Sequence, residues 1–168
     1  MRITYEHRFT APLDDVVAMM GDEEFAAIRA NASGALECDT FVDHAEDGSF
    51  TMVMRCTMPT TAIPAEFRAF VGSSLAVRYT EVWSAPENGG DRDDREGTFA
   101  FEIPGTPGHA RGAVVLRADG DGTAFGLAGD VHAPVAIVGA VVERAVAAAI
   151  EQGLPGQLAA ADAWLAAK

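Results

Sequence analysis

Three residues that can donate or accept a proton, Glu81, Tyr79 and His7, lie in segments where apolar and polar side chains alternate. Glu81 lies between Tyr79 and Trp83 in the segment 74–83, where alternation places all three on the inward face of a strand. A carboxylate on an apolar face is costly unless it is paired, hydrogen-bonded or neutral. Glu81 is thus a candidate to anchor a polar ligand group, or to act as a general acid or base with a raised pKa. The alternative is a structural carboxylate satisfied by a neighbouring hydroxyl, arginine or water.

His7 is the second candidate, and the same alternation places it inward between Tyr5 and Phe9. A histidine on an apolar face is either a satisfied core residue or a hydrogen-bond or proton donor to a ligand. Glu81, His7 and Tyr79 therefore make up the catalytic candidates of the chain.

Motifs for other chemistries are missing from the sequence. It has no P-loop, no dinucleotide fingerprint, no Cys-x-x-Cys and no His-Glu-x-x-His. The four histidines are scattered along the chain, so we expect neither a metal site nor a cofactor. The two cysteines, Cys38 and Cys56, oppose each other if the loop Glu46-Asp47-Gly48 closes a hairpin. A disulfide is then feasible, but a cytoplasmic setting favours two reduced thiols packed as small apolar groups.

Length and charge limit the class of protein. With 168 residues and 49% hydrophobic side chains, the chain suits one globular domain over 1–168. The 25 acidic residues against 12 basic ones give a net charge of −13, which argues against binding to nucleic acid or to an anionic membrane.

Targeting signals are also absent from the pattern. The first residues alternate apolar and polar side chains and lack the apolar core of a signal peptide. The longest apolar stretch, 133–150, carries Glu143 and Arg144, which favours an amphipathic helix over membrane insertion. We therefore expect a cytoplasmic protein.

Periodicity and turn residues predict the elements that position the candidates. Pro12 and Asp22 suit the starts of two short helices, and Pro134 starts a long one that we expect to kink or break at Gly153 and Pro155. The segment 85–96 is typical of a solvated loop. The predicted strands are 2–10, 35–44, 50–58, 74–83, 97–103, 110–118 and 123–132, with a further short helix over 64–72.

Antiparallel pairing across the predicted turns keeps the apolar faces together. It places Cys38 opposite Cys56, and Leu116 opposite Phe125. Across the turn at 104–108 it places Phe99 opposite Val114 and Phe101 opposite Gly112.

This order of elements resembles the helix-grip fold of the START-like (SRPBCC) superfamily. The resemblance implies an α+β fold, with a curved seven-stranded antiparallel sheet wrapped around the long C-terminal helix and two short helices after the first strand. The segments Tyr5-Glu6-His7, 79–83, 105–108, 133–139 and 163–165 more narrowly resemble an uncharacterised actinobacterial family known only as a domain of unknown function. In this fold the strands of His7 and Glu81 are not adjacent, which argues against a direct pair.

The resemblance also implies a cavity between sheet and helix that takes hydrophobic ligands. Large side chains on the predicted inner sheet face oppose a helix rich in Ala and Val. The two surfaces either pack fully against each other or leave room for a ligand. A short helix with Phe67 and Phe70 either covers the entrance or simply packs. The predicted ligand-binding residues are Tyr5, His7, Met52, Met54, Phe67, Phe70, Tyr79, Glu81, Trp83, Phe99, Phe101, Val138 and Val142.

Three functions compete at this point. The first is binding of a small hydrophobic or amphipathic ligand, such as a lipid or a polyketide-like compound. The second is a cyclase- or aromatase-like enzyme using Glu81, His7 and Tyr79. The third is a protein-interaction module whose acidic surface meets a basic partner, although solubility alone explains that charge.

Overall fold

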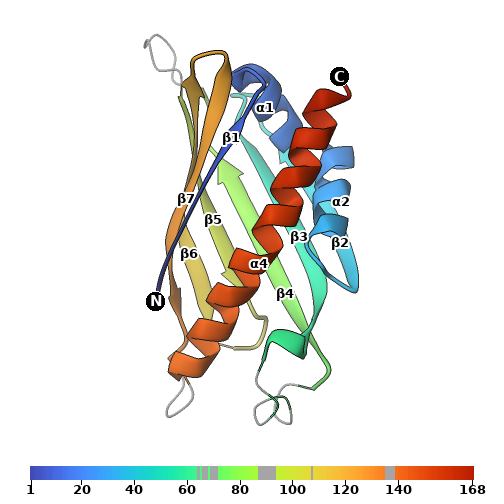
Figure 1. The fold of residues 1–168 in the computed structure, drawn as a ribbon, viewed down its shortest axis with the longest axis vertical. Helices are drawn as coiled ribbons and strands as arrows, with labels where there is room; N and C mark the ends of the chain where they lie inside the picture. The colour runs from blue at the N-terminus through green and yellow to red at the C-terminus, as the bar shows by residue number, and fades with distance from the viewer. Residues whose placement is uncertain (64, 66–67, 69–71, 87–93, 107, 135–138) are drawn as a thin grey trace.

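A single curved antiparallel sheet dominates the computed structural model, which describes all residues except 64, 66–67, 69–71, 87–93, 107 and 135–138 (Figure 1). The sheet order is β1-β7-β6-β5-β4-β3-β2. The strands are β1 (Arg2–Phe9), β2 (Glu37–His44), β3 (Phe50–Pro59), β4 (Ser74–Trp83), β5 (Asp94–Glu102), β6 (His109–Asp119) and β7 (Gly122–His132).

Helix α4 (Gly139–Ala166) crosses the concave side of this sheet (Figure 1). Two short helices, α1 (Leu13–Met20) and α2 (Glu23–Ala32), follow the first strand, and a 3₁₀ turn, η1 (Thr60–Ala62), follows β3. The predicted α+β helix-grip architecture is thereby confirmed. None of the helices in the described residues is long and apolar enough to cross a membrane.

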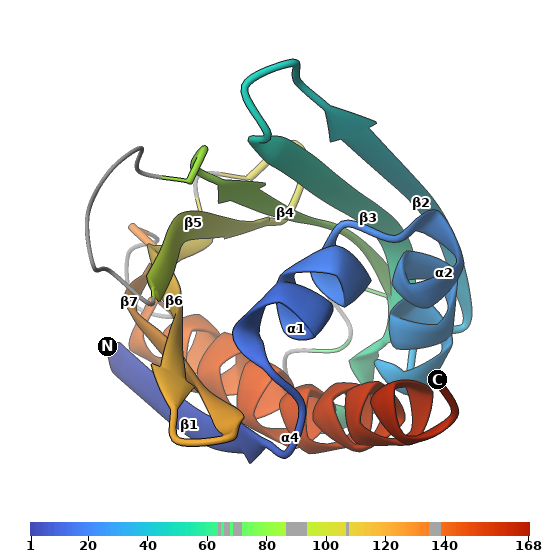
Figure 2. The ribbon, with the colours of Figure 1, turned by 90° about the horizontal axis from the view of Figure 1, so that it is seen from above.

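The two short helices close one side and one end of the sheet. Asp22 caps α2, because its Oδ1 accepts a hydrogen bond of 2.9 Å from the backbone N–H of Phe25. Helix α2 packs against both β2 and α4. Helix α1 buries Val16, Met19 and Met20, and it lies inside the ring formed by sheet and α4 (Figure 2).

The β2–β3 hairpin has the predicted register. Its three-residue loop ends on Gly48, whose φ of 82° favours glycine, and Cys38 pairs with Cys56 across the strands. The structure joins these two residues in a disulfide, so the expectation of reduced thiols is wrong here. Direct opposition explains the bond, since it brings the two Cα atoms within 4.0 Å of each other.

The β5–β6 pairing differs from the prediction by two residues. Phe99 pairs with Gly112 and Phe101 with Ala110, because a turn closed by the N–H and hydroxyl of Thr106 on the carbonyl of Ile103 begins earlier than expected. A shift of two leaves every side chain on its predicted face. Strand β5 also begins at Asp94, inside the segment predicted as loop.

Helix α4 is continuous through Gly153 and Pro155, so a break there is ruled out, whereas the alternative of a kink stays a prediction. Pro155 is exposed, and buried residues on both sides of it, Leu154 and Leu158, hold the helix against the core. Pro134, the predicted start, is not helical, and residues 135–138 between it and α4 lie outside the described part of the chain, as does most of the helix predicted over 64–72.

The core is concentrated at the α1 end of the sheet. Its largest side chains are aromatic, and they pack with residues of the sheet, α1 and the C-terminal half of α4. The buried aromatic members are Phe9, Phe25, Phe50, Trp83, Phe99 and Phe125. The opposite half of the concave face, toward η1, is packed differently.

Candidate ligand-binding cavity

A hollow of about 340 Å³ lies between the sheet and the N-terminal half of α4. Its walls are almost wholly apolar, which suits a small hydrophobic ligand. Strand β3 contributes Met54, Cys56 and Met58, strand β4 contributes Leu75, Val77 and Tyr79, and α4 contributes Val142, Ala145, Val146, Ala149 and Gly153.

The change of side-chain size along α4 explains why the hollow lies at this end. The N-terminal half of α4 lines the hollow mostly with Val and Ala, whereas the C-terminal half packs Leu158, Trp164 and Leu165 into or against the core. Small side chains on the helix leave space against the curved sheet, and close packing fills the other half.

A buried polar cluster borders the cavity and centres on Glu81, which has no exposed surface. The Arg29 guanidinium on α2 and the Tyr79 hydroxyl each donate a hydrogen bond of 2.6 Å to Glu81 Oε1. Trp83 Nε1 donates one of 3.0 Å to Oε2. Both carboxylate oxygens are therefore satisfied, as in the structural alternative considered for Glu81.

The charges in this cluster are fixed by their neighbours. Burial alone would raise the pKa of Glu81, but the charge of Arg29 and the three donors outweigh it and hold the pKa below its ordinary value. Burial and the nearby carboxylate raise the pKa of Tyr79 well above its ordinary value. At neutral pH Glu81 is thus ionised, Tyr79 is neutral and Arg29 is charged.

Gln157 of α4 extends the cluster to the cavity wall. Arg29 Nε donates a hydrogen bond of 2.9 Å to Gln157 Oε1, and both Gln157 and Tyr79 line the hollow. The sequence reasoning missed Arg29 and Gln157. A signal for Arg29 was present, because it lies four residues after Phe25 and so shares the inward face of α2.

The predicted ligand-binding residues divide into four groups. Met54, Tyr79, Phe101 and Val142 line the cavity, and Glu81 lies next to it, bonded to Tyr79. Met52, Trp83 and Phe99 are buried in the solid core, and Tyr5 packs against it. Phe67, Phe70 and Val138 lie outside the described residues. His7, the last of the thirteen, is not among the described residues that line the cavity.

His7 lies at the outer edge of the α4 packing and not among the described cavity-lining residues. Its Nε2 is 3.1 Å from Asp162 Oδ2 on α4, and 23% of its side chain is exposed. Strand β1 is separated from β4 by three strands, so the structure does not bring His7 to Glu81, as expected from the fold. Across the described residues, no three His, Cys, Asp or Glu side chains gather as metal ligands do.

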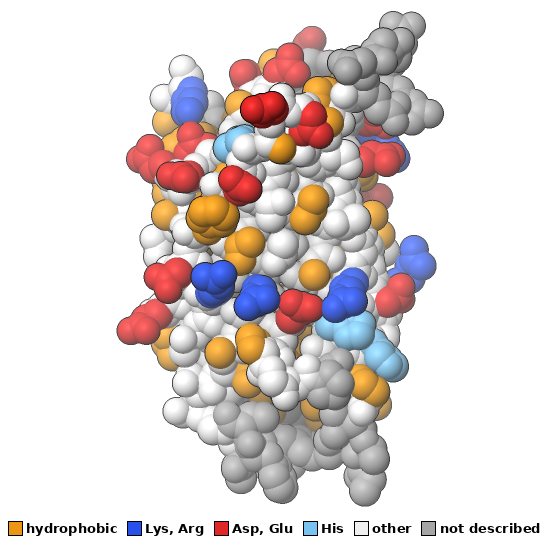
Figure 3. Space-filling model, turned by 180° about the vertical axis from the view of Figure 1, so that it is seen from behind, with side chains coloured by type: hydrophobic (Ala, Val, Ile, Leu, Met, Phe, Trp, Pro, Cys, Tyr) orange, Lys and Arg blue, Asp and Glu red, His pale blue; other side chains and the backbone are white. Residues whose placement is uncertain are grey.

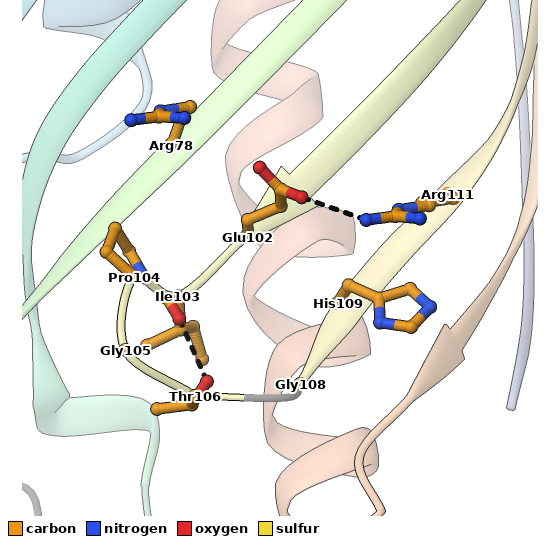
Figure 4. A pocket seen from close by; sticks show the side chains of 9 residues that line it. All are labelled: Arg78, Glu102, Ile103, Pro104, Gly105, Thr106, Gly108, His109 and Arg111. Carbon is orange, nitrogen blue, oxygen red and sulfur yellow. Dashed lines mark hydrogen bonds and ion pairs between the residues drawn. The ribbon is translucent and has the colours of Figure 1, made fainter.

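A second hollow, of about 320 Å³, lies on the outer face of the sheet. This face carries acidic and basic side chains in a row (Figure 3), in which Arg55 pairs across strands with Arg78, and Arg78 with Glu102. Arg78, Glu102, His109 and Arg111 surround the hollow, and Arg111 forms an ion pair of 2.9 Å with Glu102 (Figure 4). Its charged, exposed walls do not suit an apolar ligand, so the inner cavity is the candidate site.

The curved sheet and the long helix across it form the START-like helix-grip fold. More narrowly, the chain belongs to the DUF2505 family, described as "Protein of unknown function (DUF2505)", which matches residues 4–165. The predicted resemblance to a family of unknown function within this fold is thereby confirmed. No functionally curated protein matches the sequence.

Solved structures of similar fold cover nearly the whole chain at low identity. A protein of Thermus thermophilus is 13% identical with a TM-score of 0.66, covering 99% of this chain and 98% of its own. The STAR-related lipid transfer protein of Xanthomonas axonopodis is 17% identical, with a TM-score of 0.59 and coverage of 98% and 85%. The Zhui aromatase/cyclase of a Streptomyces species is 13% identical, with a TM-score of 0.58 and coverage of 98% and 93%. At these identities the likeness concerns the fold.

Proposed function

We propose that this protein binds a small hydrophobic or amphipathic molecule, such as a lipid or a polyketide-like compound, between the sheet and α4. The observation that carries the proposal is the apolar hollow of about 340 Å³, which is within the range of small-molecule sites. Methionine side chains on its wall, Met54 and Met58, adapt to ligands of different shape.

The fold supports the same proposal. One structural neighbour is a lipid transfer protein and another an aromatase/cyclase, so this architecture accommodates apolar molecules in other proteins. A bound ligand would fill the space that the small side chains of α4 leave between the helix and the sheet.

A cavity-filling substitution tests this proposal. Ala145 lines the cavity, so Ala145→Trp should occupy the space of the ligand and abolish binding of phenylnaphthylamine, an uncharged apolar fluorophore. Ala159 is exposed on the same helix, and Ala159→Trp should bind the fluorophore as the unchanged protein does. Thermal unfolding of both variants verifies that each is folded.

Native mass spectrometry of freshly purified protein adds an independent readout. We expect a bound apolar molecule in the unchanged protein and in Ala159→Trp, and none in Ala145→Trp. Fluorophore binding that is equal in all three proteins would place the site elsewhere and defeat the proposal.

Turnover of the ligand by a cyclase-like mechanism has less support. Of the three catalytic candidates, Tyr79 alone lines the cavity, and its hydroxyl hydrogen is engaged by Glu81. Glu81 is ionised and accepts three hydrogen bonds, which leaves it poorly placed to exchange a proton with a ligand.

A further inference from the structure

The hydrogen-bonding groups of the cavity wall are nearly all used within the protein. The hydroxyl of Thr60 donates to the carbonyl of Gly72, that of Thr106 to Ile103, and that of Ser33 to Ala30. The Tyr79 hydroxyl donates to Glu81. A ligand that enters the cavity therefore meets few donors that are free to bind it.

Gln157 is the exception among the described lining residues. Arg29 Nε donates a hydrogen bond to Gln157 Oε1. The oxygen of the Gln157 amide therefore faces Arg29, and its –NH₂ group faces away from Arg29. That group carries two hydrogens, of which the carbonyl of Gly153, 3.4 Å from the nitrogen, accepts one. The wall thus offers one donor to an acceptor atom of a ligand.

The cavity offers no uncompensated positive charge at this end, as far as the described residues extend. Arg29 is 5% exposed, and its charge is opposed by Glu81 at 2.6 Å. A carboxylate brought beside Gln157 would be buried without a counter-ion and next to an existing carboxylate, which is costly. An uncharged carbonyl or hydroxyl oxygen meets no such penalty.

We propose that the ligand is an amphipathic molecule with an uncharged head group that carries an acceptor oxygen, bound with this head against the Gln157 amide. Its apolar remainder lies along Met58, Val142 and Val146 of the cavity wall. This inference rests on the proposed function and narrows the class of ligand. Carbonyl and hydroxyl compounds fit it, whereas fatty acids in their ionised form do not.

The test compares three ligands of equal chain length by displacement of phenylnaphthylamine: dodecan-2-one, dodecanol and dodecanoate. At neutral pH we expect the ketone and the alcohol to bind at least about tenfold more tightly than the carboxylate. Dodecanoate binding as tightly as the ketone would overturn the inference and leave the proposed function standing. Failure of the fluorophore itself to bind would overturn both.

Two variants of Gln157 locate the head group. Gln157→Leu removes the donor without adding a charge beside the cavity, so ketone binding should fall about tenfold, the equivalent of one hydrogen bond, while fluorophore binding persists. Gln157→Met should have the same effect on the ketone if the first variant fails to fold. Gln152 is exposed on the same helix, and Gln152→Leu is the matched control with no expected change. Unchanged ketone affinity in a folded Gln157 variant would overturn the inference.

Discussion

Glu81 is ionised inside the protein because three hydrogen-bond donors surround it, one of which is the Arg29 cation. Its carboxylate could not remain charged and fully buried without the Arg29 guanidinium at 2.6 Å and the hydrogen bonds from Tyr79 and Trp83. The pair connects β4 to α2, two elements that are distant in the sequence. Its main role is thus structural, and it also sets the neutral electrostatics of the cavity end.

Removing one partner of this pair should destabilise the protein strongly. Glu81→Gln leaves Arg29 as a buried cation without a counter-ion, and we expect a loss of about 3–5 kcal/mol in the free energy of unfolding at neutral pH. Urea denaturation measures this loss. Exposed Glu24→Gln is the control, with an expected change within about 0.5 kcal/mol. An unchanged urea midpoint for Glu81→Gln would show that the ion pair does not form in solution.

The same pair gives the protein a dependence on pH. The pKa of Glu81 in the folded state lies below its ordinary value of 4.5, so the unfolded chain binds the proton first as the pH falls. The contribution is therefore complete above about pH 4.5 and is lost as the pH drops through the folded pKa. Urea denaturation over this range should show the difference between the unchanged protein and Glu81→Gln shrinking toward acid pH. A difference that stays constant would contradict the lowered pKa.

At the scale of elements, the disulfide joins edge strand β2 to β3 behind the cavity. Cys38 and Cys56 are 18 positions apart, and Cys56 lines the hollow. The cytoplasmic location predicted from the sequence remains a prediction. Such a location would favour two reduced thiols over this disulfide, because cytosolic thiols are usually reduced.

Because the structure joins Cys38 to Cys56, thiol titration of the unfolded, unreduced protein should find no free cysteine. Reduction should then lower the free energy of unfolding by about 3 kcal/mol, as expected for a closed loop of this length. The double variant Cys38→Ser with Cys56→Ser should not respond to the reductant. Two titratable thiols in the unreduced protein would instead support the reduced state predicted from the sequence.

Helices α2 and α4 approach each other closely at Gly156. A Cβ atom there would lie 2.8 Å from the backbone carbonyl oxygen of Ala32, which cannot move without shifting α2. Gly156→Ala should therefore lower the free energy of unfolding by about 1–3 kcal/mol, although alanine favours the helix.

Gly153→Ala is the matched control for this contact. Its Cβ would lie 3.4 Å from the carbonyl of Ser33, an ordinary contact, so this variant should be as stable as the unchanged protein or more stable. Urea denaturation ranks the three proteins. A Gly156→Ala variant more stable than Gly153→Ala would mean that the helices are farther apart than described.

At the scale of the molecule, one half of the concave face is solid and the other half is hollow. Aromatic side chains and α1 fill one end, and small side chains of α4 leave the other open. The chain has a net charge of −13, and among the described residues Glu81 is the single buried acid. The electrostatics of the described interior are therefore set by one compensated pair, Arg29 and Glu81.

The sequence by itself determined the architecture of this protein. Alternation placed Tyr79, Glu81 and Trp83 inward, and turn residues marked the hairpin that sets Cys38 opposite Cys56. These features depend on neighbours close in the chain, whose geometry follows from the period of strands and the requirements of turns. The sequence could not distinguish the observed β5–β6 register from the predicted one, which differs by two residues, because both registers leave the same side chains facing inward.

Tertiary structure alone decided which residues meet at the site. Arg29 of α2 binds Glu81, and Gln157 of α4 binds Arg29, so their meeting depends on how those two helices cross the sheet. His7 shows the converse, since it follows the inward alternation of β1 and yet meets Asp162 at the edge of α4. The position of the hollow was likewise decided by the difference in side-chain size along α4 against the curved sheet, because packing between distant elements has no signature in local periodicity.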